Sequence, residues 1–177
     1  MGRLLPQRST VDIALRLSMT ALEEEYVHLA ACVERLQNAW MTLHAIQANK
    51  TSPLVGPAFR FALVEYATLY TASRGQVTRK HKLDASLVPV AHFELHKRIL
   101  AERDSVHAHT DLTVRDARLY FNDVQGKRYA TVVSNYVHGL EELNNLEQIV
   151  ELVEGTLDNM FEHRDALERA IPPKPCI

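Results

Sequence analysis

The sequence predicts an all-α protein, folded as an up-and-down helical bundle with long first and last helices. Near the start of the chain, apolar residues recur at alternating spacings of four and three, which is the periodicity of one face of a helix. The same pattern returns near the end of the chain. The 177 residues contain no internal repeat and no low-complexity tract. We therefore expect a single domain over 1–177, with an ordered core over about 9–171.

The first helix is predicted from one apolar seam. Its members are Leu15, Met19, Leu22, Tyr26, Leu29, Val33, Leu36, Trp40 and Leu43. Ser9 or Thr10 can cap the start of this helix, and Asn49 with the Gly56-Pro57 pair ends it. Such a helix would be on the order of 50 Å long, which is more than a small globular core requires. Part of the seam is therefore expected to pack on a second chain, which predicts a homodimer.

Two further helices are predicted before the middle of the chain. The second covers 58–73, where Phe59, Leu63, Tyr66 and Tyr70 recur at helical spacing. Residues 75–89 form a polar loop that Pro89 closes. The third helix follows this loop and leads into the segment 102–111.

A change of periodicity near 117–134 predicts a short β-hairpin. Two apolar runs, 119–121 and 129–133, flank a polar stretch that contains Gly126. A helix through the same residues is the alternative. The last helix is predicted from a second seam, in which Gly155 is a weak point and Pro172-Pro173 is the end. That seam consists of Leu143, Leu146, Val150, Val153, Leu157 and Met160.

Composition restricts the class of protein. Hydrophobic residues make up 46% of the chain, enough for a sizeable core. Lys and Arg number 20 against 22 Asp and Glu, so a broad basic surface for nucleic acid is absent. Any contact with RNA must be local, and the basic run 74–82 is the candidate for it, unless that run is a solvated loop.

The cysteines and the terminus predict a cytoplasmic protein. Cys32 and Cys176 make a poor framework for a disulfide, which indicates a reducing compartment. The first residues lack the apolar core of a signal peptide, and no segment approaches the roughly 20 apolar residues of a membrane span. We therefore expect no contact with a membrane.

The segment 102–111 carries the chemistry. It holds Arg103, Asp104, His107 and His109 within seven residues. The planar guanidinium of arginine suits phosphate, and histidine moves protons near neutral pH. The combination points to phosphodiester chemistry.

The same segment resembles the signature of the HEPN superfamily (higher eukaryotes and prokaryotes nucleotide-binding). That signature is an arginine with a polar residue directly after it and a histidine four to six residues later. Here Asp104 follows Arg103, and five residues separate Arg103 from His109. Ala108, His109 and Asp111 also match the Ala-His-x-Asp ending. Over 10–170 the helical pattern resembles HEPN proteins of the abortive-infection type.

The resemblance implies a metal-independent endoribonuclease, without a cofactor, whose composite site lies at a dimer interface. It implies that His109 transfers a proton and that Arg103 contacts the phosphoryl oxygens. It also implies that Asp104 orients one of these two side chains. Family members include toxins and phage-defence effectors, many of them encoded beside a nucleotidyltransferase antitoxin.

Three alternatives stay open. Helix geometry favours His107 over His109, because a helix over 90–107 would align His107 with Arg103. A metal site is the second alternative, since His92 and His96 are four residues apart on the third helix. The third is a non-catalytic helical module for dimerisation or for nucleotide or RNA binding.

Overall fold

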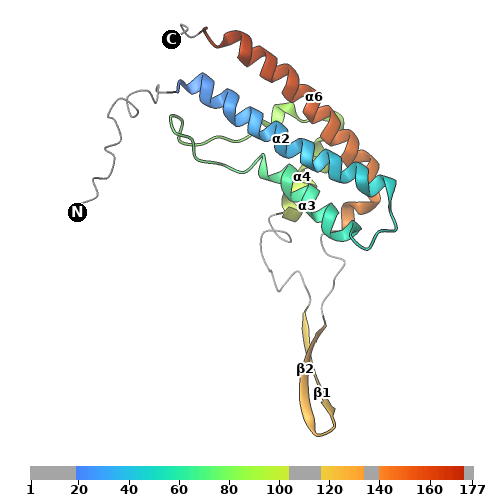
Figure 1. The fold of residues 1–177 in the computed structure, drawn as a ribbon. Coiled ribbons are helices and arrows are strands. Elements are labelled where there is room, and N and C mark those ends of the chain that lie inside the picture. The colour runs from blue at the N-terminus through green and yellow to red at the C-terminus, as the bar shows by residue number, and fades with distance from the viewer. Residues whose placement is uncertain (1–18, 104–116, 134–139, 174–177) are drawn as a thin grey trace, which may run out of the picture.

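The computed structural model describes residues 19–103, 117–133 and 140–173 (Figure 1). Within these ranges the protein is mostly helical and holds a two-stranded antiparallel sheet. The α-helices are α2 (Ala21–Ala48), α3 (Val55–Thr68), α4 (Phe93–Glu102) and α6 (Leu146–Ala170), and the strands are β1 (Arg118–Val124) and β2 (Lys127–Val133). No helix in the described ranges is long and apolar enough to cross a membrane. A largely helical fold with a hairpin is confirmed, and the up-and-down bundle stays a prediction.

The first helix begins later than the sequence predicts. Thr20 has an extended backbone and caps α2, whereas the predicted caps Ser9 and Thr10 lie outside the described residues. The Thr20 hydroxyl accepts a hydrogen bond from the backbone N–H of Glu23, and the Glu23 carboxylate accepts one from the Thr20 N–H. This reciprocal capping box fixes the start of the helix. The 28 residues of α2 span about 42 Å, which is shorter than the predicted helix. The length of this helix is therefore a weaker reason to expect a second chain.

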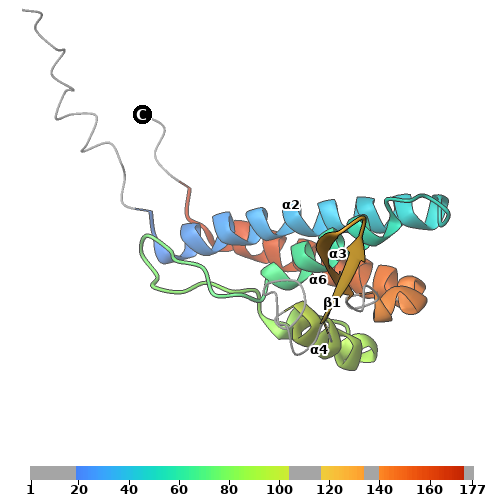
Figure 2. The same cartoon turned by 90° about the horizontal axis from the view of Figure 1, so that it is seen from below.

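The hydrophobic core lies where α2 packs against α3 and α6. Both partners run antiparallel to α2, and α2 and α6 lie side by side along most of their length (Figures 1 and 2). Most of the predicted seam of α2 is buried here, including Leu29, Val33, Leu36 and Leu43. α3 contributes Phe59, Leu63 and Tyr66, and α6 contributes Ile149, Leu152, Val153 and Met160.

Trp40 departs from the predicted seam. Its side chain is 36% exposed, whereas the neighbouring Ala39 is fully buried. The indole Nε1–H donates a hydrogen bond to Glu154 Oε1 over 2.9 Å. Because a tryptophan N–H needs a partner, the ring lies at the rim of the core, where the Glu154 carboxylate reaches it.

The boundaries of α3 also differ from the predicted 58–73. The Gly56-Pro57 pair was expected to end the first helix, but it lies in the first turn of α3. Proline is tolerated there because its missing N–H would have had no partner within the helix. The helix ends at Thr68, so Tyr70 falls in the turn that follows.

The last helix, α6, begins at Leu146 and ends at Ala170, just before the two prolines. Leu143 was expected inside it but lies in a short 3-10 helix, η4 (Glu141–Asn145). Gly155 has a packing role: a Cβ atom there would lie 2.7 Å from Pro89 Cγ. The segment between η1 (Ala85–Leu87) and η2 (Val90–His92), which leads into α4, thus rests directly on α6.

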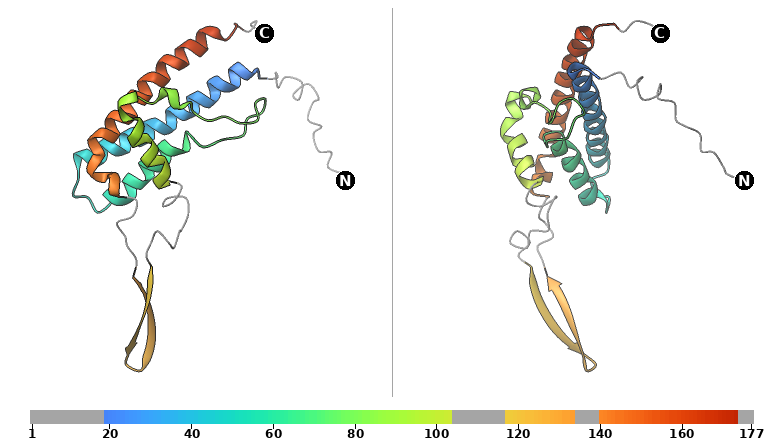
Figure 3. Two further views of the ribbon diagram at one scale, coloured as in Figure 1. Left: turned by 180° about the vertical axis from the view of Figure 1, so that it is seen from behind. Right: turned by 90° about the vertical axis from the view of Figure 1, so that its left-hand side faces the viewer.

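The hairpin is built on a two-residue turn. Gln125 and Gly126 have φ angles of 52° and 74°, which is the type I′ geometry favoured between twisted strands. Asn122, Asp123 and Arg128, expected in the loop, belong to the strands instead. The predicted hairpin is confirmed, and the alternative of a helix through these residues is wrong. The two strands extend away from the helices (Figure 3).

Candidate functional site

Arg103 is the one predicted site residue within the described ranges. It caps the C-terminal end of α4 with helical backbone angles, φ −57° and ψ −45°, and its side chain is half-buried. Asp104, His107 and His109 lie outside the described residues. Whether the helix continues to 107, and which histidine acts, therefore stay predictions.

A buried pair of polar side chains anchors α4. His96, in the middle of this helix, is 3% exposed. Its Nδ1 lies 2.8 Å from the hydroxyl oxygen of Tyr66 on α3, and the two are hydrogen bonded. The ring of Tyr70 lies edge-on to the His96 ring, with their centroids 4.5 Å apart. These contacts fix the helix whose end carries Arg103.

The anchoring groups are neutral near pH 7. Burial lowers the pKa of His96, which disfavours its charged form. Burial also raises the pKa of Tyr70 to about 12. The Tyr70 hydroxyl is buried and has no hydrogen-bond partner among the described residues. The cluster of Tyr66, Tyr70 and His96 is therefore a structural support and carries no charge.

A second polar cluster lies beside the end of α4. Arg98 holds the carboxylate of Glu142 in a two-point contact: its Nε–H donates to Oε1 over 2.5 Å and its Nη2–H donates to Oε2 over 3.2 Å. Asn145 donates a further hydrogen bond to Oε2 over 2.7 Å. Hydrogen bonding to Arg98 lowers the pKa of Glu142, so that this buried carboxylate is charged. The contact joins α4 to η4.

Sequence reasoning named Glu102 only as a possible metal ligand and did not predict its raised pKa. Burial, followed by the negative charges of Glu141 and Glu142, raises the pKa of Glu102 to about 7. A carboxyl group with such a pKa can take up or give off a proton near neutral pH. Glu102 is the last residue of α4 and directly precedes Arg103 in the chain, and the cation that lowers its pKa is Arg98. The local sequence held no signal of this, because the two carboxylates come from a distant segment.

Among the described residues, the alternative of a metal site on His92 and His96 finds no support. His92 Nε2 lies 3.6 Å from Glu151 Oε2 on α6, whereas His96 bonds to Tyr66. The two imidazoles thus have different partners. Among residues 19–103, 117–133 and 140–173, no group of three or more histidine, cysteine or acidic side chains could hold a metal ion.

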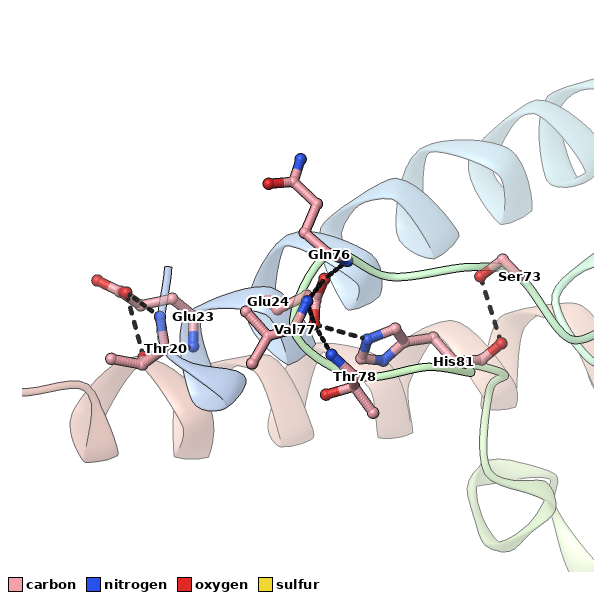
Figure 4. A network of polar contacts seen from close by, with 8 residues as sticks. All are labelled: Thr20, Glu23, Glu24, Ser73, Gln76, Val77, Thr78 and His81. Carbon is pink, nitrogen blue, oxygen red and sulfur yellow. Dashed lines mark hydrogen bonds and ion pairs between the residues drawn. The ribbon is translucent and has the colours of Figure 1, made fainter. Parts of the chain in front are cut away.

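The basic run 74–82 forms a loop held by one buried carboxylate (Figure 4). Glu24, 5% exposed on α2, accepts hydrogen bonds from the backbone N–H groups of Gln76, Val77 and Thr78. Val77 N lies 3.0 Å from the carboxylate and Thr78 N lies 2.6 Å from it. Successive N–H groups that converge on one anion form a nest, an arrangement that favours negative charge.

The charge state of Glu24 keeps the loop in place. Burial alone would raise the pKa of Glu24, but the backbone N–H groups and His81, whose Nε2 lies 3.2 Å from Oε2, lower it to about 2. The carboxylate is therefore ionised at any physiological pH. The base of the loop is closed by two backbone hydrogen bonds between Ser73 and His81.

The loop exposes a concentrated positive charge. In the part of the chain that the structure describes, its four cations are exposed and form no ion pair. They are Arg74, Arg79, Lys80 and Lys82. The prediction of a solvated loop is thus compatible with a role in binding, because unpaired cations on a held backbone can meet phosphates.

Comparisons with family models, with curated proteins and with solved structures find no match to this chain.

Proposed function

We propose that the chain is a HEPN-like, metal-independent endoribonuclease that acts in the cytoplasm as a toxin or phage-defence effector. Its Arg/His site would lie at the interface of a homodimer of up-and-down helical bundles. The observation that carries the proposal is the sequence Arg103-Asp104, with His109 after five intervening residues and Asp111 after it. The position of Arg103 at the end of a well-anchored helix supports it.

The proposed chemistry needs two proton transfers and one stabilised phosphate. The ribose 2′-hydroxyl loses a proton to a base and attacks the adjacent phosphorus, and the bond from phosphorus to the 5′ oxygen breaks. The leaving oxygen takes up a proton, so the products are a 2′,3′-cyclic phosphate and a 5′-hydroxyl. Arg103 would bind the phosphoryl oxygens, and Asp104 would orient the side chain of Arg103 or of His109. His109, or His107 in its place, would transfer a proton.

Glu102 adds a second proton carrier to this scheme. A pKa of about 7 would let Glu102 serve as acid or base, and Glu102 is the neighbour of Arg103 in the sequence. A site with one histidine and one such carboxyl per chain contains both the base and the acid that the reaction needs. A nucleotidyltransferase antitoxin would be the partner that restrains the enzyme.

The second candidate function is a non-catalytic module for dimerisation and for nucleotide or RNA binding. One observation favours it specifically: the basic loop over 74–82, whose unpaired cations need no catalytic residue to bind a phosphate backbone. A binding module would keep this surface and the dimer but would cleave nothing.

A cleavage assay on RNA, with and without EDTA, tests the first proposal. Arg103→Ala and His109→Ala should each reduce cleavage by about 10²- to 10⁴-fold, the usual contribution of a proton carrier or charge stabiliser. Wild-type cleavage should survive EDTA and leave 2′,3′-cyclic phosphate ends. Lys97→Ala, which removes an exposed cation from the same helix, is the matched control and should cleave normally.

Three results would contradict parts of the scheme. Full activity in His109→Ala with loss in His107→Ala would show that the other histidine acts. Loss of cleavage in EDTA would indicate a metal-dependent reaction. An intact dimer that cleaves no RNA would favour the binding module, for which Lys80→Ala should weaken RNA binding and reduce its salt dependence by about one counterion.

A further inference from the structure

A groove lies between α2 and α6, the two long helices that run side by side (Figure 2). Its volume is about 400 Å³, which is within the range of clefts that hold small ligands. Its lining combines two aromatic rings, an aliphatic floor, two carboxylates and an amide. These are Trp40 and Phe161, Leu157, Glu154 and Asp158, and Gln37. We call this cleft the Trp40 groove.

Two contacts hold the Trp40 ring in one orientation at the wall of the groove. The indole Nε1–H donates to Glu154 Oε1 over 2.9 Å, and the ring of His44 lies edge-on to the indole, with their centroids 4.5 Å apart. The indole is therefore ordered before any ligand binds, which reduces the conformational entropy lost on binding. Among aromatic side chains, tryptophan offers the best face for a cation.

The carboxylates of the groove carry negative charge with acceptor oxygens to spare. Glu154 Oε1 accepts hydrogen bonds from Trp40 and His44, which lower the pKa of Glu154, so this group is ionised near pH 7. Among the described residues, Glu154 Oε2 and both oxygens of Asp158 have no hydrogen-bond or ion-pair partner. Asp158 follows Glu154 by one helical turn, and like charges at this spacing repel each other. A cation bound between them would relieve that repulsion.

The chain's own nearest guanidinium leaves the groove open. The Arg164 guanidinium lies over the ring of Phe161, 5.1 Å from its centroid, but Arg164 does not line the groove. Its Nη2 also lies 3.6 Å from Asp165 Oδ1, so its charge is partly offset by that carboxylate. The contact with Phe161 shows that this part of the molecule already pairs a guanidinium with an aromatic ring.

We propose that the Trp40 groove binds a guanidinium group carried on an apolar stem. The planar guanidinium stacks on the indole of Trp40 and donates hydrogen bonds to Glu154 Oε2 and to Asp158, and the stem lies along Leu157 and Phe161. A free alkylguanidine and an arginine side chain of a partner protein both offer this chemistry. The site is independent of the proposed ribonuclease, because no residue of the groove belongs to the segment 102–111.

Trp40 is the only tryptophan of the chain, so its indole N–H gives a single reporter signal in a ¹H–¹⁵N correlation spectrum. Butylguanidinium should shift this signal with saturation, at a dissociation constant on the order of 1 mM. Butylurea has nearly the same shape but no charge, so it should bind about tenfold more weakly. Asp158→Asn removes one exposed carboxylate and should weaken the binding of butylguanidinium about threefold.

The matched control is Glu168→Gln, which removes the same charge about 15 Å further along α6 and should leave the dissociation constant unchanged. A blocked Gly-Arg-Gly peptide separates the two sources of the guanidinium. Tighter binding than that of butylguanidinium identifies an arginine of a partner protein, and binding that is no tighter identifies a free small cation. The inference is wrong if the indole signal shows no saturable shift, if butylurea binds as well as butylguanidinium, or if Asp158→Asn and Glu168→Gln behave alike.

Discussion

Replacing Tyr66 with phenylalanine should destabilise the protein by about 1 to 3 kcal/mol. The change keeps the buried ring and removes only the oxygen that bonds to His96 Nδ1. Since His96 is 3% exposed, water cannot replace the lost partner, and an unsatisfied buried polar group costs about 1 to 3 kcal/mol. Urea unfolding followed by circular dichroism at 222 nm would measure this loss as a lower midpoint at constant m-value.

Tyr70→Phe is the matched control, because it removes a hydroxyl that has no partner among the described residues. It should change the free energy of unfolding by less than about 0.5 kcal/mol, or stabilise the protein. Equal losses for both variants would refute the reasoning, as would a loss below about 0.5 kcal/mol for Tyr66→Phe. The lowered pKa of His96 adds a pH dependence: below pH 6.5, the usual pKa of an imidazole, the unfolded chain binds a proton that the folded chain refuses, so stability falls as the pH falls.

Burial and charge lead to three further predictions. Leu29→Ala and Val153→Ala should each cost about 2 to 4 kcal/mol, since both side chains are buried between α2 and α6, and a change below about 0.5 kcal/mol in urea unfolding would place either side chain outside the core. The pKa of Glu24 is lowered from 4.5 to about 2, so its stabilisation is present above pH 4.5 and is lost toward pH 2. Glu24→Gln should remove this acid dependence and speed amide hydrogen exchange in the loop, and unchanged exchange would contradict the role of the carboxylate. The pKa of Glu102 is raised from 4.5 to about 7, so its contribution is complete below pH 4.5 and declines as the pH rises through 7. Glu102→Gln should flatten the stability profile in that interval, and a profile identical to wild type would show that Glu102 titrates normally.

The sequence predicted the helices well because their buried residues recur at short, regular spacings. Leu29, Leu36 and Val153 were placed in the core by periodicity alone, and all three are buried. The boundaries were less predictable, because competing caps lie close together in the sequence. Thr20 and Glu23 form the capping box at which α2 begins, whereas the apolar pattern alone extends further toward the N-terminus.

The hairpin was predictable from its two apolar runs, but its turn was not. The apolar runs predicted a loop of seven residues over 122–128. In the structure the turn consists of Gln125 and Gly126 alone, both with positive φ angles, and the other five residues of that range are paired in the strands.

The candidate site was predicted only as a local motif. Arg103 was singled out from its neighbours in sequence, whereas Glu102 acquires its raised pKa from Glu141 and Glu142, which only the folded chain brings near. The role of Glu24 was likewise hidden, because its three N–H partners lie more than 50 residues along the chain. Motifs reveal residues that are close in sequence, while charge environments depend on packing across the fold.

The contact between Gly155 and Pro89 has a consequence for how this chain can diverge. An alanine at 155 would gain about 1 kcal/mol of helix propensity, yet its Cβ would lie 2.7 Å from a rigid ring and would push the segment before α4 away from α6. A larger residue at 155 is therefore compatible with the fold only when position 89 loses its ring. In descendants of this sequence the two positions should change together. Their covariation would identify the contact that determines the position of α4, and with it the position of Arg103.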